Sequence, residues 1–324
     1  MFFFRLCCFL SLFFVPLFAL SRPLSLEDLY KAALKENFSY LTSEFDVQQA
    51  KTQYRQVVSE VLPNLQLVSS NVFRDQLEAE GVAGAFGEGY QRTSFAQITQ
   101  PLFQGGSEYF FLQAAQSNTK SKLWQQRQAK LNLFARLANS FYTWFLFKAQ
   151  FDNNKERLDL LRQRLGVLTQ RAAIGQSRQT DVLSARSQVL REEAEKVRLK
   201  SLLKQQEQVL LAFTGVDSLG SLQDSLTLKS LKVPPGWEKS ILQTPQLKAI
   251  EALRKQALQQ RRANQATFVP SVDLNGNYFF ERAGILEQSR WEVTVDATWE
   301  VFAGGERSAQ IQSQNIEARR YEAQ

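Results

Sequence analysis

The 324-residue sequence predicts a mostly α-helical fold with four β-strands suited to a membrane, built as an internal duplication. Three observations support this fold class. The segment "WEVTVDATWEV" at 291–301 alternates apolar and polar residues with period 2, as a strand with one apolar face does. A segment without proline runs from Ser107 to Gly166, long enough for an extended helix. The pattern Phe-x-Gly-Gly occurs twice, at 103–106 and 302–305.

Residues 1–21 have the layout of a secretory signal peptide. An apolar run follows Arg5, and Ala19 and Ser21 are small residues at the −3 and −1 positions of a cleavage after Ser21. A transmembrane anchor is the alternative, but so short an apolar run barely spans a bilayer. Both cysteines lie inside this segment, so the mature chain is predicted to contain none.

The composition excludes several functional classes. The chain has no His, which removes His-based triads and His–zinc sites, and we expect no metal and no cofactor. The net charge of +7 is spread along the chain without a basic, aromatic-interleaved module, so we expect no nucleic-acid partner. After residue 21 no apolar stretch reaches about 18 residues, so any membrane crossing must use strands.

The duplication defines the predicted domains. "LPNLQLVSSNVFRD" at 62–75 aligns with "VPSVDLNGNYFFER" at 269–282, and each copy reads helix, X-Pro, strand, loop, strand, Phe-x-Gly-Gly, helix. The predicted organisation is a first repeat at 22–215 with a β-hairpin at 62–103, a linker or side element at 216–244, and a second repeat at 245–324 with a β-hairpin at 269–302.

The helices are predicted from their caps and periodicity. Ser25 and Asp28 resemble a capping box, and the helix that follows is expected to run to Val61, just before Pro63. In the second copy a helix is expected from about Gln246 to Thr267. The long helix from Ser107 and a returning helix from about Thr180 to Phe213 form a helical hairpin with its tip near 171–181. On the returning helix, Val182/Leu183, Val189/Leu190 and Val197 recur every seven residues, which predicts a coiled-coil seam.

The repeated Pro and Gly residues mark the junctions between helix and strand. Pro63 and Pro270 end a helix and start an extended segment. After the second strand of each copy, a helix follows at once, and a bulky Cβ at that bend is unfavourable. The residues expected there are Gly105, Gly106, Gly304 and Gly305.

The strands raise a problem of closure. Four strands cannot close a membrane barrel, since the smallest need about eight. Open sheet edges are excluded from lipid, because each unpaired N–H or C=O group costs several kcal/mol. If these strands cross a membrane, several copies of the chain must share one barrel. Aromatic residues near the strand ends, such as Phe73, Trp291 and Trp299, resemble interface girdles, although an ordinary helix–sheet core explains them equally well.

The polar side of the last predicted strand carries Glu292, Asp296 and Glu300. Asp296 and Glu300 are about 13 Å apart along a strand, too far for glycoside-type chemistry, so we predict no enzyme. We interpret the three residues as an acidic row that lines a lumen and favours cations. Pairing with Arg residues of a neighbouring strand is the alternative.

The order of these motifs resembles the TolC-like outer membrane efflux protein family. The resemblance covers nearly the whole chain and rests on "VLPNLQL", "QPLFQGG", "AAIGQSRQTDVLSAR", "FVPSVDL" and "WEVFAGG". It implies a homotrimer in the outer membrane lipid, whose protomers each give four strands to a twelve-stranded barrel and whose coiled-coil helices form a periplasmic tunnel. A periplasmic adaptor (membrane fusion protein) and an inner membrane pump are the implied partners. The implied function is a passive conduit for drugs, toxins or proteins in tripartite efflux or type I secretion.

The resemblance also places the hairpin tip at the tunnel entrance, where it meets the adaptor. The implied tip residues are Arg171, Gly175, Gln176, Thr180 and Asp181. We expect Gly175 to permit a tight turn and Thr180 or Asp181 to cap the returning helix; a gating bond of Asp181 to a neighbouring helix is a further hypothesis. Gln176 departs from the apolar residue that family members often place there.

The second repeat is predicted to be incomplete. By comparison with the first repeat, roughly 90 residues are missing after Gln324, so the second tip is absent, as in a fragment or a truncated protein. The alternative function is a periplasmic coiled-coil adaptor or scaffold protein without a pore, which explains the helical hairpin but not the four amphipathic strands.

Overall fold

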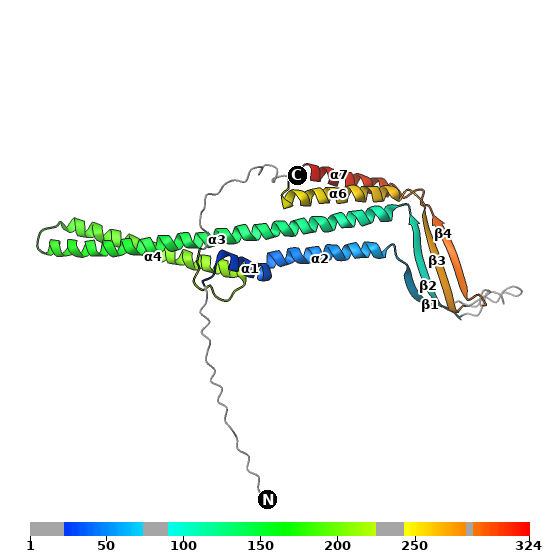
Figure 1. The fold of residues 1–324 in the computed structure, drawn as a ribbon, viewed down its shortest axis with the longest axis horizontal. Coiled ribbons are helices and arrows are strands. Elements are labelled where there is room, and N and C mark those ends of the chain that lie inside the picture. Colours follow the sequence, from blue (N-terminus) through cyan, green and yellow to red (C-terminus); the bar gives the residue numbers. More distant parts are fainter. Residues whose placement is uncertain (1–22, 74–89, 225–242, 283–287) are drawn as a thin grey trace, which may run out of the picture. The chain divides into compact units, whose positions relative to one another are not determined.

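The chain forms two compact units in the computed structural model, which describes residues 23–73, 90–224, 243–282 and 288–324. The helical unit comprises 1–37 and 134–230, and the sheet unit comprises 38–133 and 231–324. The units therefore cut across the two predicted repeats. The 67-residue helix α3, Ser107–Ala173, contributes one part to each unit (Figure 1). The predicted signal peptide and most of the predicted linker lie outside the described residues.

The helical unit starts with the short helix α1, Leu26–Glu36. Its predicted capping box is present, because the Ser25 hydroxyl accepts from the Asp28 N–H and the Asp28 carboxylate accepts from the Ser25 N–H. The helix ends at Asn37, whose backbone is extended and whose amide donates to the carbonyl of Phe213. The prediction of one helix up to Val61 is therefore wrong: α2, Phe38–Ser59, is a separate helix in the sheet unit.

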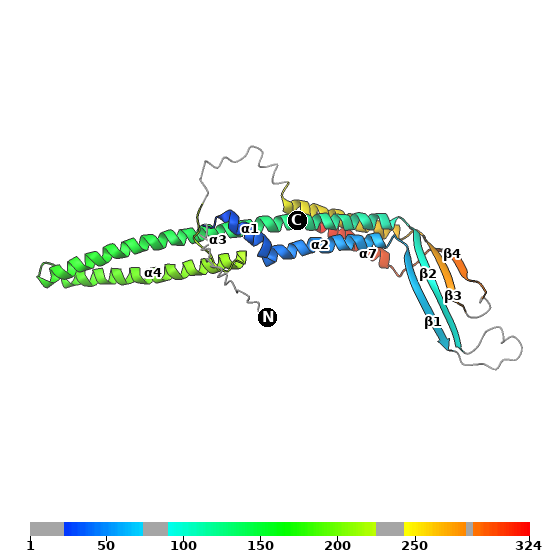
Figure 2. The ribbon, with the colours of Figure 1, turned by 60° about the horizontal axis from the view of Figure 1, so that its bottom comes forward.

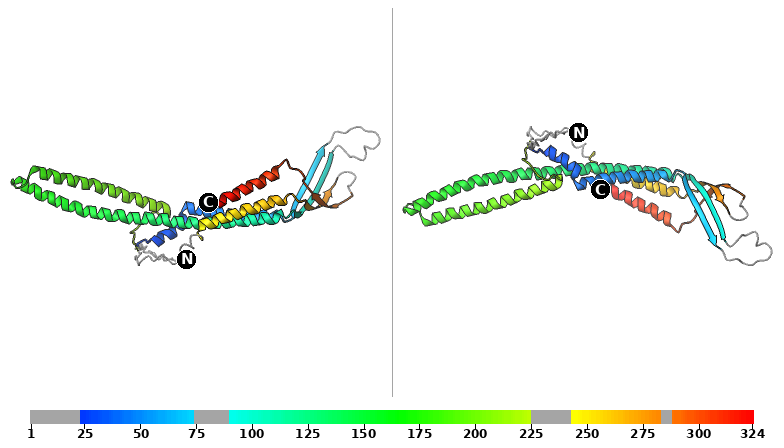
Figure 3. Two further views of the ribbon diagram at one scale, coloured as in Figure 1. Left: turned by 90° about the horizontal axis from the view of Figure 1, so that it is seen from above. Right: turned by 90° about the horizontal axis from the view of Figure 1, so that it is seen from below.

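A pair of antiparallel helices forms most of the helical unit. The second part of α3 lies beside α4, Gln179–Thr214, in both views of Figure 3. Buried positions on α4 fall at heptad-like spacings, which supports coiled-coil packing: Ala185, Val189, Leu199, Leu203 and Leu210. The predicted seam was partly wrong, because Leu183, Leu190 and Val197 are exposed. These three residues form a separate apolar stripe on α4.

A buried polar cluster links α3 to α4. Asn154 is 1% exposed, and its amide donates to the Glu192 carboxylate at 2.6 Å and to the Glu192 carbonyl at 3.4 Å. Arg157 pairs with the same carboxylate at 2.6 Å. A single buried polar group in a coiled coil fixes the register of the two helices at a cost in stability. Asn154 and Glu192 therefore set how α3 and α4 align.

The sheet unit contains one antiparallel sheet in the order β1-β2-β3-β4 (Figure 2). The strands are β1 Asn64–Phe73, β2 Tyr90–Gln104, β3 Ser271–Glu281 and β4 Trp291–Thr298. The two predicted hairpins are present, and β2 pairs with β3 to join them into one sheet. The strand β4 ends three residues before the predicted alternation does. β4 has a neighbour only on one side, and β3 pairs with it only as far as Thr298.

Four helical segments meet the same end of this sheet: α2, the first part of α3, α6 (Pro245–Ala266) and α7 (Glu306–Glu322) (Figure 1). The predicted helix of the second copy is confirmed as α6. Buried Ser121 of α3 donates to the carbonyl of Ala249 in α6 at 3.1 Å. Arg254 of α6 pairs with Glu322 of α7. Within the described ranges, no helix is both long and apolar enough to span a membrane.

Replacing Glu192 with Ala should destabilise the helical unit by about 2–3 kcal/mol, because buried Asn154 then loses a charge-assisted hydrogen bond. The neighbouring change Glu193→Ala removes only an exposed pair with Arg162 and should cost less than about 1 kcal/mol. Thermal unfolding of the detergent-solubilised protein, followed by circular dichroism, measures both. Equal shifts for the two variants would contradict the proposed role of the cluster.

Candidate functional site

The strand register sorts the side chains of the sheet onto two chemically different faces. One face, called here the apolar face, is largely open to solvent in the isolated chain: Leu67 is 78% exposed and Val295 is 63% exposed. Its apolar members are Leu65, Leu67, Phe73, Tyr90, Ala96, Ile98, Val272, Leu274, Tyr278, Phe280, Trp291, Val293, Val295 and Ala297, and the register also places Ser69, Asn71, Arg92, Ser94 and Gln100 on this face. An exposed apolar surface of this kind marks a contact with lipid or with protein.

The opposite face, called here the polar face, carries amides, hydroxyls and carboxylates. Its polar members include Gln66, Gln97, Thr99, Asp273, Asn275, Asn277, Glu292, Thr294 and Asp296. Hydrogen bonds cross between the strands on this face, from Thr99 to Asn275 at 2.7 Å and from Gln104 to Asp273 at 2.9 Å. The sheet thus has one lipid-compatible side and one water-compatible side.

The predicted acidic row is only partly assembled. Glu292 and Asp296 lie on the polar face of β4, but Glu300 lies beyond the strand and pairs with Arg307 at the start of α7. Glu292 also has a cationic partner, since Arg282 donates to it at 2.8 Å. Arg partners therefore exist for two of the three carboxylates, but neither belongs to a neighbouring strand as the alternative interpretation expected: Arg282 follows the end of β3, and Arg307 is in α7. Asp296 instead accepts from the amide of Asn275 at 2.7 Å.

Sequence reasoning missed Asp273. The register places Asp273 of β3 directly opposite Asp296 of β4, so two carboxylates face each other across the polar side of the sheet. Like charges at directly opposed positions repel each other. Both carboxylates accept hydrogen bonds from neutral groups, and no ion pair of either one occurs within the described residues. The alternation of the sequence around Asp273 indicated its face, but only the register shows its neighbour.

The incoming junctions are alike in both copies. α2 ends at Ser59 and α6 ends at Ala266, each four residues before the proline that precedes the next strand. Pro63 and Pro270 each occupy the position just before the strand, as predicted. The same backbone turn bridges each gap: Leu62 N–H donates to Ser59 at 3.2 Å, and Val269 N–H donates to Ala266 at 3.1 Å.

The outgoing junctions share backbone conformation but differ in packing. Gly105, Gly106, Gly304 and Gly305 all have positive φ, which L-residues adopt at a cost. A Cβ added to Gly105 would lie 2.3 Å from the carbonyl oxygen of Ala266, whereas a Cβ on Gly304 would meet no atom within 4 Å. Close packing against α6 therefore restricts only the first junction.

The hairpin tip closes with a Schellman motif at the end of α3. The N–H of Gln176 donates to the carbonyl of Arg171 at 2.8 Å, and the N–H of Gly175 donates to Ala172 at 3.1 Å. Gly175 has φ +74, so the predicted tight turn at this glycine is present. Both residues that usually make an apolar contact in this motif, Arg171 and Gln176, are polar here.

The predicted cap of the returning helix is wrong. The N-cap of α4 is Arg178, which makes no side-chain capping hydrogen bond. Thr180 and Asp181 lie inside the first turn of α4 instead. There the positive end of the helix dipole stabilises the negatively charged Asp181 carboxylate. α4 starts at Gln179, within one residue of the predicted start at about Thr180, and five residues separate it from the end of α3 at Ala173.

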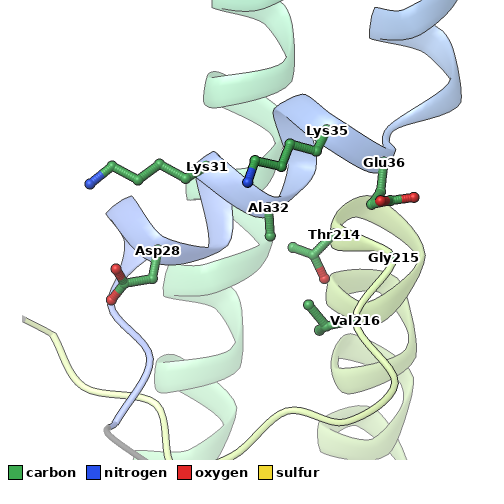
Figure 4. Close-up of a pocket in the computed structure, with 8 residues that line it drawn as sticks. All are labelled: Asp28, Lys31, Ala32, Lys35, Glu36, Thr214, Gly215 and Val216. Atoms are coloured by element: carbon green, nitrogen blue, oxygen red, sulfur yellow. The ribbon is translucent and has the colours of Figure 1, made fainter.

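A cavity of about 430 Å³ lies where α1 meets the end of α4 (Figure 4). Its lining residues are Asp28, Lys31, Ala32, Lys35, Glu36, Thr214, Gly215 and Val216. Lys31 donates to Glu27 at 2.7 Å, and this hydrogen bond raises the pKa of Lys31 above its ordinary value. The lining carries charges of both signs and gives no selectivity for one ligand class. We interpret the cavity as a packing gap between α1 and α4.

The described residues form no group of three or more acidic side chains that could hold a metal ion. What the geometry offers instead is a two-faced sheet joined directly to long helices. A family model described as "Outer membrane efflux protein" matches residues 29–216 and 237–324, well over half of the chain. The chain belongs to the outer membrane efflux protein family. This family consists of efflux channels, which agrees with the prediction that the protein is not an enzyme.

Solved structures of outer membrane channels share the fold of this family member. It resembles CusC with a TM-score of 0.79 and 20% identity over 91% of this chain and 70% of that chain. For the Campylobacter jejuni channel CmeC the TM-score is 0.81 and the identity 16%, over 92% of this chain and 66% of that chain. For VceC from Vibrio cholerae the TM-score is 0.79 and the identity 20%, over 92% of this chain and 74% of that chain. The chain thus spans about two thirds to three quarters of their lengths. The comparison with the curated proteins gave no match.

Changing Gly105 to Ala should destabilise this efflux protein by about 3 kcal/mol or more, because it adds a clash with the α6 backbone to the strain of a left-handed residue. Gly304→Ala, the matched change in the second copy, should destabilise the protein only by the strain of a left-handed backbone, about 1–2 kcal/mol. The midpoint of urea unfolding in detergent distinguishes them. A Gly304→Ala variant as unstable as Gly105→Ala would show that the junctions are equivalent.

Proposed function

We propose that the protein is the outer membrane channel subunit of a tripartite efflux or type I secretion system, a passive homotrimeric conduit for drugs, toxins or proteins. The observation that carries this proposal is the two-faced sheet within a chain of the outer membrane efflux protein family. The apolar face contacts lipid, and the polar face lines a water-filled lumen.

Closure of the barrel requires more than one copy. β1 and β4 are the outer strands of the four-stranded sheet. In lipid their unpaired backbone groups would cost several kcal/mol each, and pairing β4 of one protomer with β1 of the next removes both edges. Three copies give twelve strands, within the size range of outer-membrane barrels. The alternation beyond β4, at Trp299 and Val301, supplies further residues for such pairing.

The helices form the periplasmic part of this conduit. Exposed apolar residues recur every seven positions on the helical hairpin, at Leu160 and Val167 of α3, at Ile174 just after its end, and at Leu183, Leu190 and Val197 of α4. Heptad stripes of this kind pack against further helices, here those of neighbouring protomers. At the tip, Arg171, Gly175 and Gln176, with Thr180 and Asp181 of α4, are proposed to meet a periplasmic adaptor that connects to an inner membrane pump.

An adaptor or scaffold protein without a pore is the second candidate. The paired helices α3 and α4 suit that function equally well. The sheet does not, because a soluble scaffold gains nothing from leaving residues such as Leu67 and Val295 open to water. The channel therefore explains more of the molecule.

In planar lipid bilayers the purified trimer should conduct ions and prefer cations, because Asp273 and Asp296 face each other on the proposed lumen side. Replacing both by Asn should reduce the cation preference, measured as the reversal potential in a salt gradient. Glu300→Gln is the matched control, since Glu300 is paired with Arg307 outside the sheet. A soluble monomer without conductance would refute the channel, and anion preference in the wild type would refute the acidic lining.

Replacing Gly175 with Val should abolish efflux while leaving the amount of trimer unchanged, because Val disfavours the φ of +74 that shapes the tip. Gly166→Val is the control: Gly166 lies inside α3, and a Cβ there meets no atom within 4 Å. Drug resistance of cells that carry each variant, compared with trimer in their outer-membrane fraction, provides the measurement. Unchanged resistance with Gly175→Val would rule out the tip assignment.

A further inference from the structure

Two aromatic rings interrupt the polar face near the end of the sheet away from the helices. Phe95 of β2 and Phe279 of β3 are register partners, and their ring centroids lie 5.3 Å apart. Both side chains are half-buried. On the opposite face, the adjacent Phe280 is 65% exposed. An aromatic pair on a face of amides and carboxylates has no role in lipid contact, so it needs a different explanation.

Arg282 covers this aromatic pair. Its guanidinium carbon lies 4.0 Å from the centroid of the Phe279 ring, within the range of a cation–π interaction. The same guanidinium donates to Glu292 at 2.8 Å. The Arg282 side chain is only 14% exposed although it follows the end of β3. A planar cation is therefore held between a ring and a carboxylate.

Carboxylates elsewhere on the polar face favour the approach of a cation. Arg282 neutralises Glu292, but Asp273 and Asp296 on the same face accept hydrogen bonds only from neutral groups. Glu292 and Asp296 lie on one side of β4, about 13 Å apart along the strand. Asp273 lies six residues from Phe279 along β3, about 20 Å away, so these carboxylates attract cations to the polar face rather than to the aromatic pair directly.

We propose that Phe95, Phe279 and Glu292 form a binding site for planar organic cations, and that Arg282 is a tethered occupant that competes with them. The chemistry of the ligand follows from Arg282 itself: a flat, delocalised positive charge that stacks on Phe279 and pairs with Glu292. A bound cation of this class displaces the guanidinium from both partners. A compact ammonium ion satisfies the carboxylate but forfeits the stacking.

This inference rests on the proposed function in one respect: the polar face of the sheet must be open to water. Binding can be measured without transport, so the two proposals fail separately. A protein that conducts but lacks the site would overturn this inference alone. A protein that binds planar cations but does not conduct would overturn the channel alone.

Titration of the purified full-length protein in detergent with ethidium, a fluorescent planar cation, tests the site through fluorescence anisotropy. Glu292→Gln should weaken ethidium binding about tenfold, because it removes the charge partner. Phe279→Leu should weaken it about three- to tenfold through lost stacking, and Phe280→Leu, the neighbour on the apolar face, should leave it unchanged. Anionic fluorescein should not bind to the wild type.

Arg282→Gln provides the deciding measurement, because it should tighten ethidium binding several-fold by removing the competing cation. The affinity of Arg282→Lys for ethidium should lie between those of Arg282→Gln and the wild type, since Lys keeps the charge but loses the planar stacking. Circular dichroism and gel-filtration elution identify any variant that does not fold. Weaker ethidium binding in folded Arg282→Gln, or equal binding in all variants, would overturn the proposal.

Discussion

The backbone groups at the outer edges of β1 and β4 constrain the rest of the molecule. The sheet that leaves these edges unpaired also exposes many apolar side chains on one face. Lipid that covers the apolar face cannot form hydrogen bonds with the unpaired N–H and C=O groups of the two edge strands. The apolar face can be covered and the edge strands paired at the same time only when strands from further copies extend the sheet. Contact with the membrane and assembly of copies are therefore linked.

The change from sheet to helix is the second organising feature. Helices satisfy their own backbone hydrogen bonds, so they can leave the end of the sheet without a partner strand. Each crossing uses the same local chemistry: a proline directly before the strand, and two left-handed glycines before the outgoing helix. A sheet with two dissimilar faces is thereby connected to long helices through connections of only a few residues.

Much of the fold was predictable because its signals are local. The period-2 alternation, the capping box at Ser25, the two X-Pro dipeptides and the Gly-Gly pairs each act over a few residues. The break at Asn37 was not predictable, because it depends on a hydrogen bond to Phe213 far along the chain. The start of α4 was predicted to within one residue, but its N-cap was not, because Arg178 occupies that position without a side-chain capping hydrogen bond.

The candidate sites show the same division. Sequence alternation placed Glu292 and Asp296 on one face, but the opposition of Asp273 and Asp296 depends on strand register. The position of Arg282 over Phe279 was equally hidden, because residue 282 follows the end of β3 and local periodicity does not orient it. Features that join distant segments require the structure.

The unequal packing of the two outgoing junctions has an evolutionary consequence. When a gene segment duplicates, both copies begin under identical selection. Here Gly105 touches the α6 backbone, whereas Gly304 faces open space. Gly105 therefore admits almost no amino-acid replacement, while Gly304 tolerates small side chains at the cost of backbone strain alone. Related sequences should therefore diverge sooner at the second Gly-Gly pair, and the first pair should stay easier to recognise.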